Sequence, residues 1–198
     1  MGTRSDNVTW HAGAVDRVRR AGSTGGAGAT AWLTGLPASG KSTIAVALEA
    51  ALLDRKRVAY VLDGDNLRHG LNGNLGFSAE DRAENVRRTG EVARLFADAG
   101  VVAVVSLVSP YEADRARVRE IHEAQGLPFV EVFVDTPLEE CERRDPKGLF
   151  ARARAGELKG MTGIDDPYEA PRSPELHLKP LEQSVEQSVA TLLARLAG

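Results

Sequence analysis

The residues best suited to chemistry form a glycine-rich run, Gly35–Thr43, which reads Gly-Leu-Pro-Ala-Ser-Gly-Lys-Ser-Thr. This spacing, G-x-x-x-x-G-K-[ST], is that of a phosphate-binding loop, and it stands between an apolar run, Ala31–Leu33, and a helical pattern, Ile44–Leu53. Its glycines permit the backbone angles that turn successive N–H groups toward an anion, and the helix adds its positive dipole end. The pattern predicts that Lys41 reaches the β- and γ-phosphates of a nucleoside triphosphate and that Ser42 helps to hold Mg²⁺. A chance glycine-rich turn is the alternative, and the flanking patterns argue against it.

A second polar segment, Asp63–Arg68, reads Asp-Gly-Asp-Asn-Leu-Arg and directly follows an apolar run. In phosphoryl transfer to a hydroxyl group, a carboxylate near the γ-phosphate must organise Mg²⁺ or accept the proton of the acceptor. We expect Asp63 to fill this role with Asp65 as its helper, because the same segment supplies Arg68 as an anion binder. Asp135, which follows a later apolar run, is a rival. Turn-forming residues without chemistry are the remaining alternative.

The segment Phe77–Gly100 is predicted to be a helix with readable ends. Ser78 and Asp81 resemble a capping box, and Gly100 is placed as a helix stop. One stripe of small and apolar residues would face the sheet, and it consists of Ala83, Val86, Gly90, Ala93 and Ala97.

The start of this helix suggests a binding surface for a nucleotide. A hydrophobic staple would pair Phe77 with position 82, which is an arginine, so the ring lacks its usual local partner. Arg82 and Asn85 project from the first turns near the expected ligand crevice. An exposed aromatic ring beside an arginine and an asparagine suits a nucleobase or a nucleotide anion. Taken singly, each of these residues is more often plain surface.

The most basic part of the chain extends from Cys141 to Lys159. Its cations are Arg143, Arg144, Lys147, Arg152, Arg154 and Lys159. Small kinases place a mobile lid at this point of the chain, and cations brought down on the transferring phosphoryl group would stabilise its charge and exclude water. We therefore expect a lid over about residues 144–166, with a solvated helix face as the alternative. Gly160–Pro167 reads as an irregular loop.

Short apolar runs alternate with helical stretches and predict a sheet. The runs are Ala31–Thr34, Val58–Leu62, Val101–Leu107, Phe129–Val134 and a weaker fifth run, Leu176–Leu178. Continuous apolar strands are expected in a parallel sheet that helices cover on both faces. We therefore expect a doubly wound, mostly parallel α/β domain of the P-loop nucleoside triphosphate hydrolase/kinase type over residues 29–198, with a helix over Val185–Leu196. Ligands of such domains bind beyond the carboxyl ends of the strands.

Residues 1–28 are expected to form an arm, in which Ala21–Gly28 is a flexible connector. Trp10 must find an apolar surface on its own subunit or on a partner.

Composition limits the classes of function. With 198 residues and 42% hydrophobic content, the chain fits one globular domain. The net charge of -3 argues against a nucleic-acid or membrane-surface binder. Cys141 is the single cysteine, which excludes an intramolecular disulfide and favours a reducing compartment. The chain has no apolar run near the length of about 18 residues that a membrane span needs, so we expect a cytoplasmic enzyme.

Several segments together resemble the adenylylsulfate kinase (APS kinase) family. The resemblance covers about residues 7–180 and rests on Asn7–His11, Gly35–Thr43, Asp63–Asn72, Leu75–Ser78, Asp81–Arg88, Ser109–Tyr111, Arg144–Leu149 and Lys159–Asp165. It implies that ATP phosphorylates the 3′-hydroxyl of adenosine 5′-phosphosulfate and gives 3′-phosphoadenosine 5′-phosphosulfate, the activated sulfate donor. It also implies Mg²⁺ as cofactor, a homodimer and a functional link to an ATP sulfurylase.

Site residues carry over from the family by position. The resemblance implies that ATP contacts Gly35, Ala38, Ser39, Gly40, Lys41, Ser42, Thr43 and Arg144, and that Ser42 and Asp63 hold the metal ion. It implies that the phosphosulfate substrate contacts Arg68, Phe77, Arg82, Asn85, Val108, Ser109, Lys147, Gly160 and Met161. Ser109 matches a serine that some members carry as a phosphoenzyme, and we treat it as a pocket residue.

The chain departs from the family pattern at three places. Pro37-Ala38 stands where Ser-Gly is more usual, at positions that the motif leaves open. Met161 stands where a phenylalanine is expected, so a flexible thioether would form the second side of an adenine sandwich with Phe77 and would weaken substrate binding or substrate inhibition. The connector differs as well, which bears on a dimer role of the arm.

Two other functions compete with this interpretation. One is a P-loop kinase for another small acceptor, such as a nucleoside monophosphate or a sugar acid. The other is a catalytically silent nucleotide-binding module, which would be expected to lack Lys41, Asp63 or Arg82, and all three are present.

Overall fold

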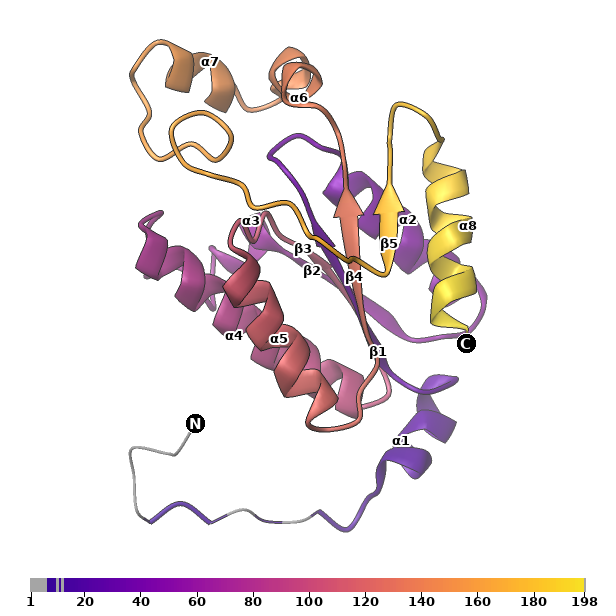
Figure 1. The fold of residues 1–198 in the computed structure, drawn as a ribbon. Helices are drawn as coiled ribbons and strands as arrows, with labels where there is room; N and C mark the ends of the chain where they lie inside the picture. Colours follow the sequence, from indigo (N-terminus) through magenta and orange to yellow (C-terminus); the bar gives the residue numbers. More distant parts are fainter. Residues whose placement is uncertain (1–6, 10, 12, 198) are drawn as a thin grey trace.

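A five-stranded parallel sheet forms the centre of the computed structural model, which describes residues 7–9, 11 and 13–197 (Figure 1). Its strands are β1 (Ala29–Thr34), β2 (Ala59–Asp63), β3 (Val102–Ser106), β4 (Phe129–Val134) and β5 (Leu176–Leu178). Their order is β2-β3-β1-β4-β5, and every neighbouring pair is parallel. The predicted mostly parallel sheet is confirmed, and the phosphate loop follows its central strand.

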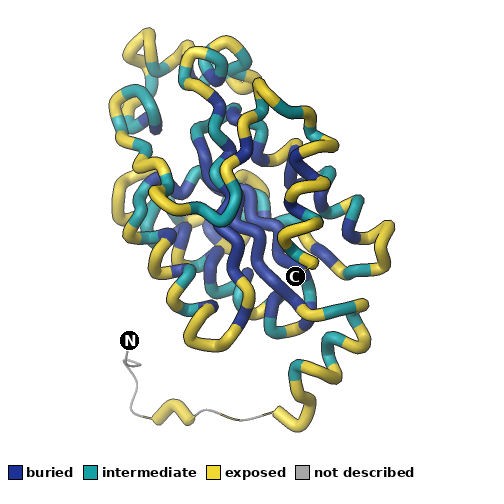
Figure 2. Tube along the Cα trace, turned by 45° about the vertical axis from the view of Figure 1, so that its right-hand side comes forward, coloured by how far each residue is buried: buried dark blue, intermediate teal, exposed yellow. Residues whose placement is uncertain are grey.

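Helices cover both faces of the sheet. On one face lie α2 (Lys41–Asp54) and α8 (Val185–Leu196), and on the other lie α4 (Ala79–Asp98) and α5 (Glu112–Glu123) (Figure 1). The strands between these layers form the buried centre of the molecule (Figure 2). Apolar side chains of the strands therefore pack on both sides, which explains why their runs are continuous rather than alternating.

The ends of α4 follow the local signals in the sequence, with one difference. The Ser78 hydroxyl accepts a hydrogen bond from the Asp81 N–H at 3.2 Å, but the Asp81 carboxylate accepts from the Gly76 N–H and not from Ser78, so the capping box is half formed. Gly100 follows the helix with a φ of 89°, as a helix stop requires. A Cβ on Gly90 would lie 2.6 Å from a methyl group of Val118, so glycine permits α4 and α5 to pack closely here.

The N-terminal part of the described chain contains a helix that we did not expect, α1 (Arg17–Thr24). Arg17 and Arg20 bind the carboxylate of Asp98 at 3.0 and 2.5 Å, so α1 is attached to the end of α4. The expected flexible connector Ala21–Gly28 is therefore helical in its first half, because these ion pairs dock the helix. Trp10 lies outside the described residues.

Three short helices stand at the carboxyl edge of the sheet: α3 (Gly64–Leu67), α6 (Leu138–Arg144) and α7 (Leu149–Arg154) (Figure 1). Cys141, Phe150 and Met161 are buried together above this edge, and we call them the lid cluster. Leu36 and Ala38 of the phosphate loop pack against this cluster, so the segment expected to form a lid shares a small apolar core with the loop. Within the part of the chain that the structure describes, no helix is long and apolar enough to cross a membrane.

Candidate active site

The phosphate loop connects β1 to α2 at the carboxyl edge of the sheet. Gly40 precedes α2 with a φ of 104°, and Ala38 is also left-handed with a φ of 61°. At Gly35, an added Cβ would lie 2.5 Å from the carbonyl oxygen of Val134, so glycine lets the loop begin this close to β4. Ser39, within the loop, is fully buried. The backbone angles are those that a cradle of N–H groups needs.

Lys41, the first residue of α2, points back into the loop. Its ammonium group donates to the carbonyl oxygens of Gly35 and Leu36 at 3.0 and 2.7 Å and to the Ser39 hydroxyl at 3.3 Å. Burial lowers the pKa of Lys41 to about 8. A cation held among oxygens at the start of a helix is suited to the oxygens of a polyphosphate.

Ser42 and Asp63 meet beside the loop. The Ser42 hydroxyl donates to Asp63 Oδ2 at 2.7 Å and lies 3.1 Å from the hydroxyl of Ser106. These residues come together because β1, β3 and β2 are neighbours and end at the same edge. The rival carboxylate, Asp135, instead lies 2.7 Å from the Nε2 atom of His177. The two residues expected to hold a metal ion are therefore in contact, and Thr43 follows them as an exposed residue of the first turn of α2.

Asp65, the expected helper of Asp63, contacts it through the backbone only. Its backbone N–H donates to Asp63 Oδ1 at 2.9 Å, whereas its carboxylate forms an ion pair with Lys147, from the loop between α6 and α7. Both side chains of this ion pair are more than half exposed. An exposed ion pair contributes little to stability. This pair does, however, connect the loop between α6 and α7 to α3.

Most cations of the basic stretch Cys141–Lys159 pair with acids that lie in this stretch or directly before it. Glu140 accepts hydrogen bonds from Arg143 and Arg144, which lower its pKa to about 2. Arg144 also lies 3.5 Å from the carbonyl oxygen of Ala38, in the phosphate loop. The other pairs are Arg154 with Glu142 and Arg152 with Glu157. Arg144 therefore approaches the phosphate loop, whereas Arg143, Arg152 and Arg154 lie on an exposed face, as the alternative interpretation of the segment expects.

A second polar surface surrounds Phe77, whose side chain is 63% exposed. The guanidinium carbon of Arg68 lies 4.2 Å from the centre of the ring, and that of Arg82 lies 5.7 Å from it. Burial, followed by the charge of Arg82, lowers the pKa of Arg68. Two guanidinium groups that repel each other over one aromatic ring form a surface suited to an anionic nucleotide.

Arg82 and Asn85 are more enclosed than the helical pattern indicated. Arg82 donates to the carbonyl oxygens of Phe77 and Gly160 at 3.0 and 2.5 Å. Asn85 is 5% exposed and accepts a hydrogen bond from the side chain of Asn72 at 2.8 Å. The structure thus brings Arg68, Phe77, Arg82 and Gly160 together, with Asn85 fixed beneath them.

Comparisons with known proteins agree on one family. A family model described as "Adenylylsulphate kinase" matches residues 27–179. The chain belongs to the adenylylsulphate kinase family. It is 55% identical to the adenylyl-sulfate kinase of Lactiplantibacillus plantarum over 98% of this chain and 93% of that protein, and 55% identical to that of Saccharomyces cerevisiae over 91% and 89%. The solved structure of the Mycobacterium tuberculosis APS kinase in complex with AMPPNP and APS superposes with a TM-score of 0.84, at 52% identity over 87% of this chain and 99% of that one.

Membership of the adenylylsulphate kinase family draws attention to Val108 and Ser109, which the resemblance assigns to the acceptor pocket. The Ser109 hydroxyl is buried, accepts from the Trp32 indole N–H at 3.1 Å and lies 3.0 Å from the Thr34 hydroxyl. The carbonyl oxygen of Val108 accepts from Thr34 at 2.7 Å. In this member of the family, the serine hydroxyl is part of an internal hydrogen-bonded network.

Met161 differs from its expected place in the adenylylsulphate kinase site. We expected its thioether to face Phe77 across the adenine of the substrate. The side chain is 5% exposed and packs in the lid cluster with Cys141 and Phe150, because the apolar faces of α6 and α7 surround it. The neighbouring carbonyl group of Gly160, which accepts from Arg82, instead borders the surface around Phe77.

The sequence patterns did not single out three residues that contact the expected site residues. Ser106 contacts Ser42, Asn72 supports Asn85, and Asp166 contacts Arg82 at 3.4 Å. Ser106 is the last residue of β3, and only the sheet order brings it to Ser42. Local spacing carries no signal for the other two contacts, which join residues 13 and 84 positions apart in the chain.

Proposed function

We propose that this protein transfers the γ-phosphoryl group of ATP to the 3′-hydroxyl of adenosine 5′-phosphosulfate, which gives ADP and 3′-phosphoadenosine 5′-phosphosulfate. The observation that carries the proposal is the pair of surfaces at one edge of the sheet, within a chain of the adenylylsulphate kinase family. One surface is the phosphate loop with Lys41 and Asp63, and the other is the exposed ring of Phe77 with Arg68 and Arg82. Phosphoryl transfer needs little more than such positioning and charge stabilisation.

In this proposal the phosphate loop binds ATP. The backbone N–H groups from Gly35 to Thr43, with Ala38, Ser39 and Gly40 among them, hold the phosphates. Lys41 moves its ammonium contacts from the carbonyl oxygens of the loop to the β- and γ-phosphates. Arg144, which lies at the carbonyl of Ala38, reaches the nucleotide from the lid.

Mg²⁺ fits the oxygen atoms at Ser42 and Asp63. A hydroxyl and a carboxylate in contact are hard ligands, and Mg²⁺ in kinases takes one or two such groups together with substrate phosphates and water. Among the described residues there is no cluster of three or more His, Cys, Asp or Glu that could hold a metal. When bound, the ion neutralises charge that develops on the β- and γ-oxygens.

Asp63 is proposed to accept the proton of the 3′-hydroxyl group, with Asp65 orienting it through its backbone N–H. The adenosine 5′-phosphosulfate lies over Phe77, with its anionic groups toward Arg68 and Arg82. Lys147 is proposed to leave its ion pair with Asp65 and to contact this substrate, as the lid segment closes over the phosphates.

An acceptor panel tests the proposal. Purified protein, ATP and Mg²⁺ are combined separately with adenosine 5′-phosphosulfate, a nucleoside monophosphate and a sugar acid, and release of ADP is followed. We expect turnover with adenosine 5′-phosphosulfate and its loss when the metal ion is chelated. Turnover with another acceptor and none with adenosine 5′-phosphosulfate would contradict the proposal, and no turnover at all would favour a catalytically silent module.

We further propose a homodimer that is linked functionally to an ATP sulfurylase. A homodimer is the assembly that the resemblance implies, and light scattering of the purified protein measures it directly. The sulfurylase link follows from the chemistry, because adenosine 5′-phosphosulfate is a mixed anhydride that another enzyme must form.

A further inference from the structure

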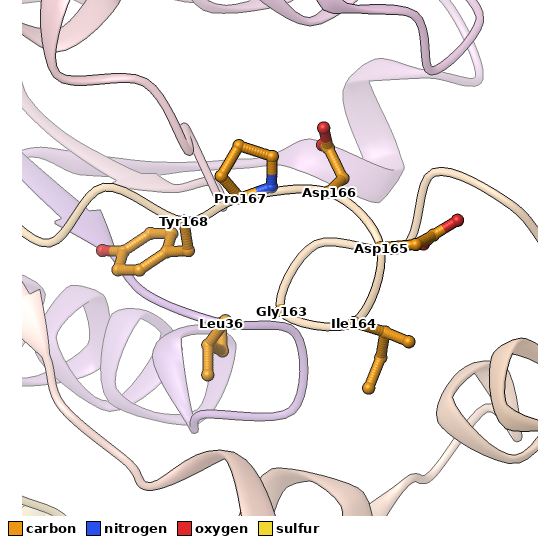
Figure 3. A pocket seen from close by; sticks show the side chains of 7 residues that line it. All are labelled: Leu36, Gly163, Ile164, Asp165, Asp166, Pro167 and Tyr168. Atoms are coloured by element: carbon orange, nitrogen blue, oxygen red, sulfur yellow. The ribbon is translucent and has the colours of Figure 1, made fainter.

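The segment Gly160–Tyr168 follows α7 and passes over the phosphate loop at Leu36 (Figure 3). In this view the side chain of Asp166 points away from Leu36, whereas that of Ile164 lies on the same side as Leu36. The Asp166 carboxylate has two partners from other parts of the fold. Its Oδ2 atom lies 3.4 Å from Nε of Arg82, and its Oδ1 atom accepts a hydrogen bond from the Tyr111 hydroxyl at 3.2 Å.

Among the residues that the structure describes, Asp166 is the acid that forms an ion pair with Arg82. The guanidinium group also donates to two backbone carbonyl oxygens, those of Phe77 and Gly160. The side chains of Arg82 and Asp166 are 12% and 20% exposed, so their attraction is weakly screened compared with that of a surface pair. The orientation of Arg82 is therefore determined from two sides, by the carbonyl oxygen of Phe77 and by Gly160 and Asp166 of the segment over the phosphate loop.

We propose that Asp166 is a positioning residue for the acceptor site, whose carboxylate, held by Tyr111, fixes the guanidinium group of Arg82 for adenosine 5′-phosphosulfate. The inference rests on the proposed function, since it concerns the same substrate. A fixed arginine binds an anion better than a free one because less side-chain freedom is lost on binding. Asp166 also offsets the repulsion between Arg82 and Arg68 above Phe77.

The side chain of Asp166 is separable from the fold of its own segment. Asp165, its neighbour, accepts from the backbone N–H groups of Gly160 and Met161 at 2.8 and 2.7 Å and so closes the turn. The backbone carbonyl of Asp166 accepts from the Gly163 N–H at 2.8 Å, whatever its side chain is. We therefore expect an Asp166→Asn variant to fold.

The test measures substrate affinity and kinetics of Asp166→Asn. Titration calorimetry gives the Kd of adenosine 5′-phosphosulfate without ATP, and steady-state kinetics give the KM of each substrate. We expect the Kd and KM of adenosine 5′-phosphosulfate to rise roughly tenfold, as for loss of one ion pair that is coupled to the binding arginine, while the KM of ATP and the Tm stay near wild type. Asp166→Glu, which restores the charge, is expected to recover part of the affinity.

Tyr111→Phe and Glu169→Gln complete the set of variants. Tyr111→Phe is expected to raise the KM of adenosine 5′-phosphosulfate by less than Asp166→Asn does. In the double variant it is expected to add little to the effect of Asp166→Asn, because both changes act on one carboxylate. Glu169→Gln is the matched control: this exposed acid directly follows the segment Gly160–Tyr168 and contacts the Glu112 N–H, not Arg82, so the variant is expected to behave as wild type.

The outcomes separate this inference from the proposed function. An Asp166→Asn variant with wild-type affinity for adenosine 5′-phosphosulfate, or with equal rises in the KM of both substrates, overturns the positioning role. Wild-type protein that accepts a different substrate instead rejects the proposed function. In that case the KM for the acceptor that is found is compared between Asp166→Asn and wild type. A higher KM in the variant supports the positioning role of Asp166, and an unchanged KM overturns it.

Discussion

At the scale of single residues, the structure distinguishes two acids that the sequence left as rivals for the role near the γ-phosphate. Asp63 and Asp135 each follow a strand of the same parallel sheet. The structure places Asp63 against Ser42 of the phosphate loop and Asp135 against His177. The difference arises from the sheet order, because β2 and β4 lie on opposite sides of β1.

This contrast gives a prediction for Asp63→Asn. An amide cannot take the proton of the 3′-hydroxyl group and is a poorer Mg²⁺ ligand than a carboxylate. We therefore expect kcat to fall roughly 10²- to 10⁴-fold, the range for loss of a general base, while ATP still binds. The measurements are ADP release and binding of a non-hydrolysable ATP analogue. Asp135→Asn is the matched control and is expected to keep kcat near wild type; a large loss of kcat there, with near-normal turnover in Asp63→Asn, would exchange the two roles.

At the scale of elements, His122 joins α5 to β1 within the core. Its Nδ1 atom lies 2.7 Å from the carbonyl oxygen of Val118, which can only accept, so this nitrogen carries the proton of the neutral ring. The Nε2 atom, 2.8 Å from the Thr30 hydroxyl, is then the acceptor. Burial lowers the pKa of His122, and Arg94 lowers it further.

A pH dependence of stability follows from this histidine. Because its pKa in the folded protein lies below the ordinary value of 6.5, the unfolded chain binds a proton more readily, and stability is lost as the pH falls below about 6.5. Urea unfolding of wild type and His122→Gln between about pH 5 and pH 7 measures this effect. We expect the wild-type free energy of unfolding to fall more steeply, by up to about 1.4 kcal/mol per pH unit; parallel curves would contradict it.

The elements themselves could be predicted where the signals are local. Continuous apolar runs identify the strands, and Ser78 and Gly100 bound α4 within a few residues. What could not be predicted depends on partners farther along the chain: α1 is held by ion pairs to Asp98, and Arg154 of α7 turns toward Glu142. For the same reason the motifs indicated an anion site around Phe77 but not the role of Asp166.

At the scale of the whole molecule, a buried ionic network joins parts of the fold that are distant in sequence. Arg115, on α5, is 2% exposed and donates to Glu131 of β4 at 2.8 Å. Its other two nitrogens donate to the carbonyl oxygens of Ser109 and Glu169 at 2.8 and 2.7 Å. One guanidinium group thus ties the turn after β3 and the end of the segment over the phosphate loop to the sheet.

We predict that Arg115→Met lowers the free energy of unfolding by about 3–5 kcal/mol, because it leaves the carboxylate of Glu131 buried without its closest partner. Arg119, 3.4 Å from Glu131, keeps the loss toward the lower end of this range. Arg143→Met removes an exposed pair on α6 as a control and is expected to change the free energy of unfolding by less than about 1 kcal/mol. Urea unfolding of both variants measures the difference, and similar small losses would mean that the two turns are held to the sheet by packing alone.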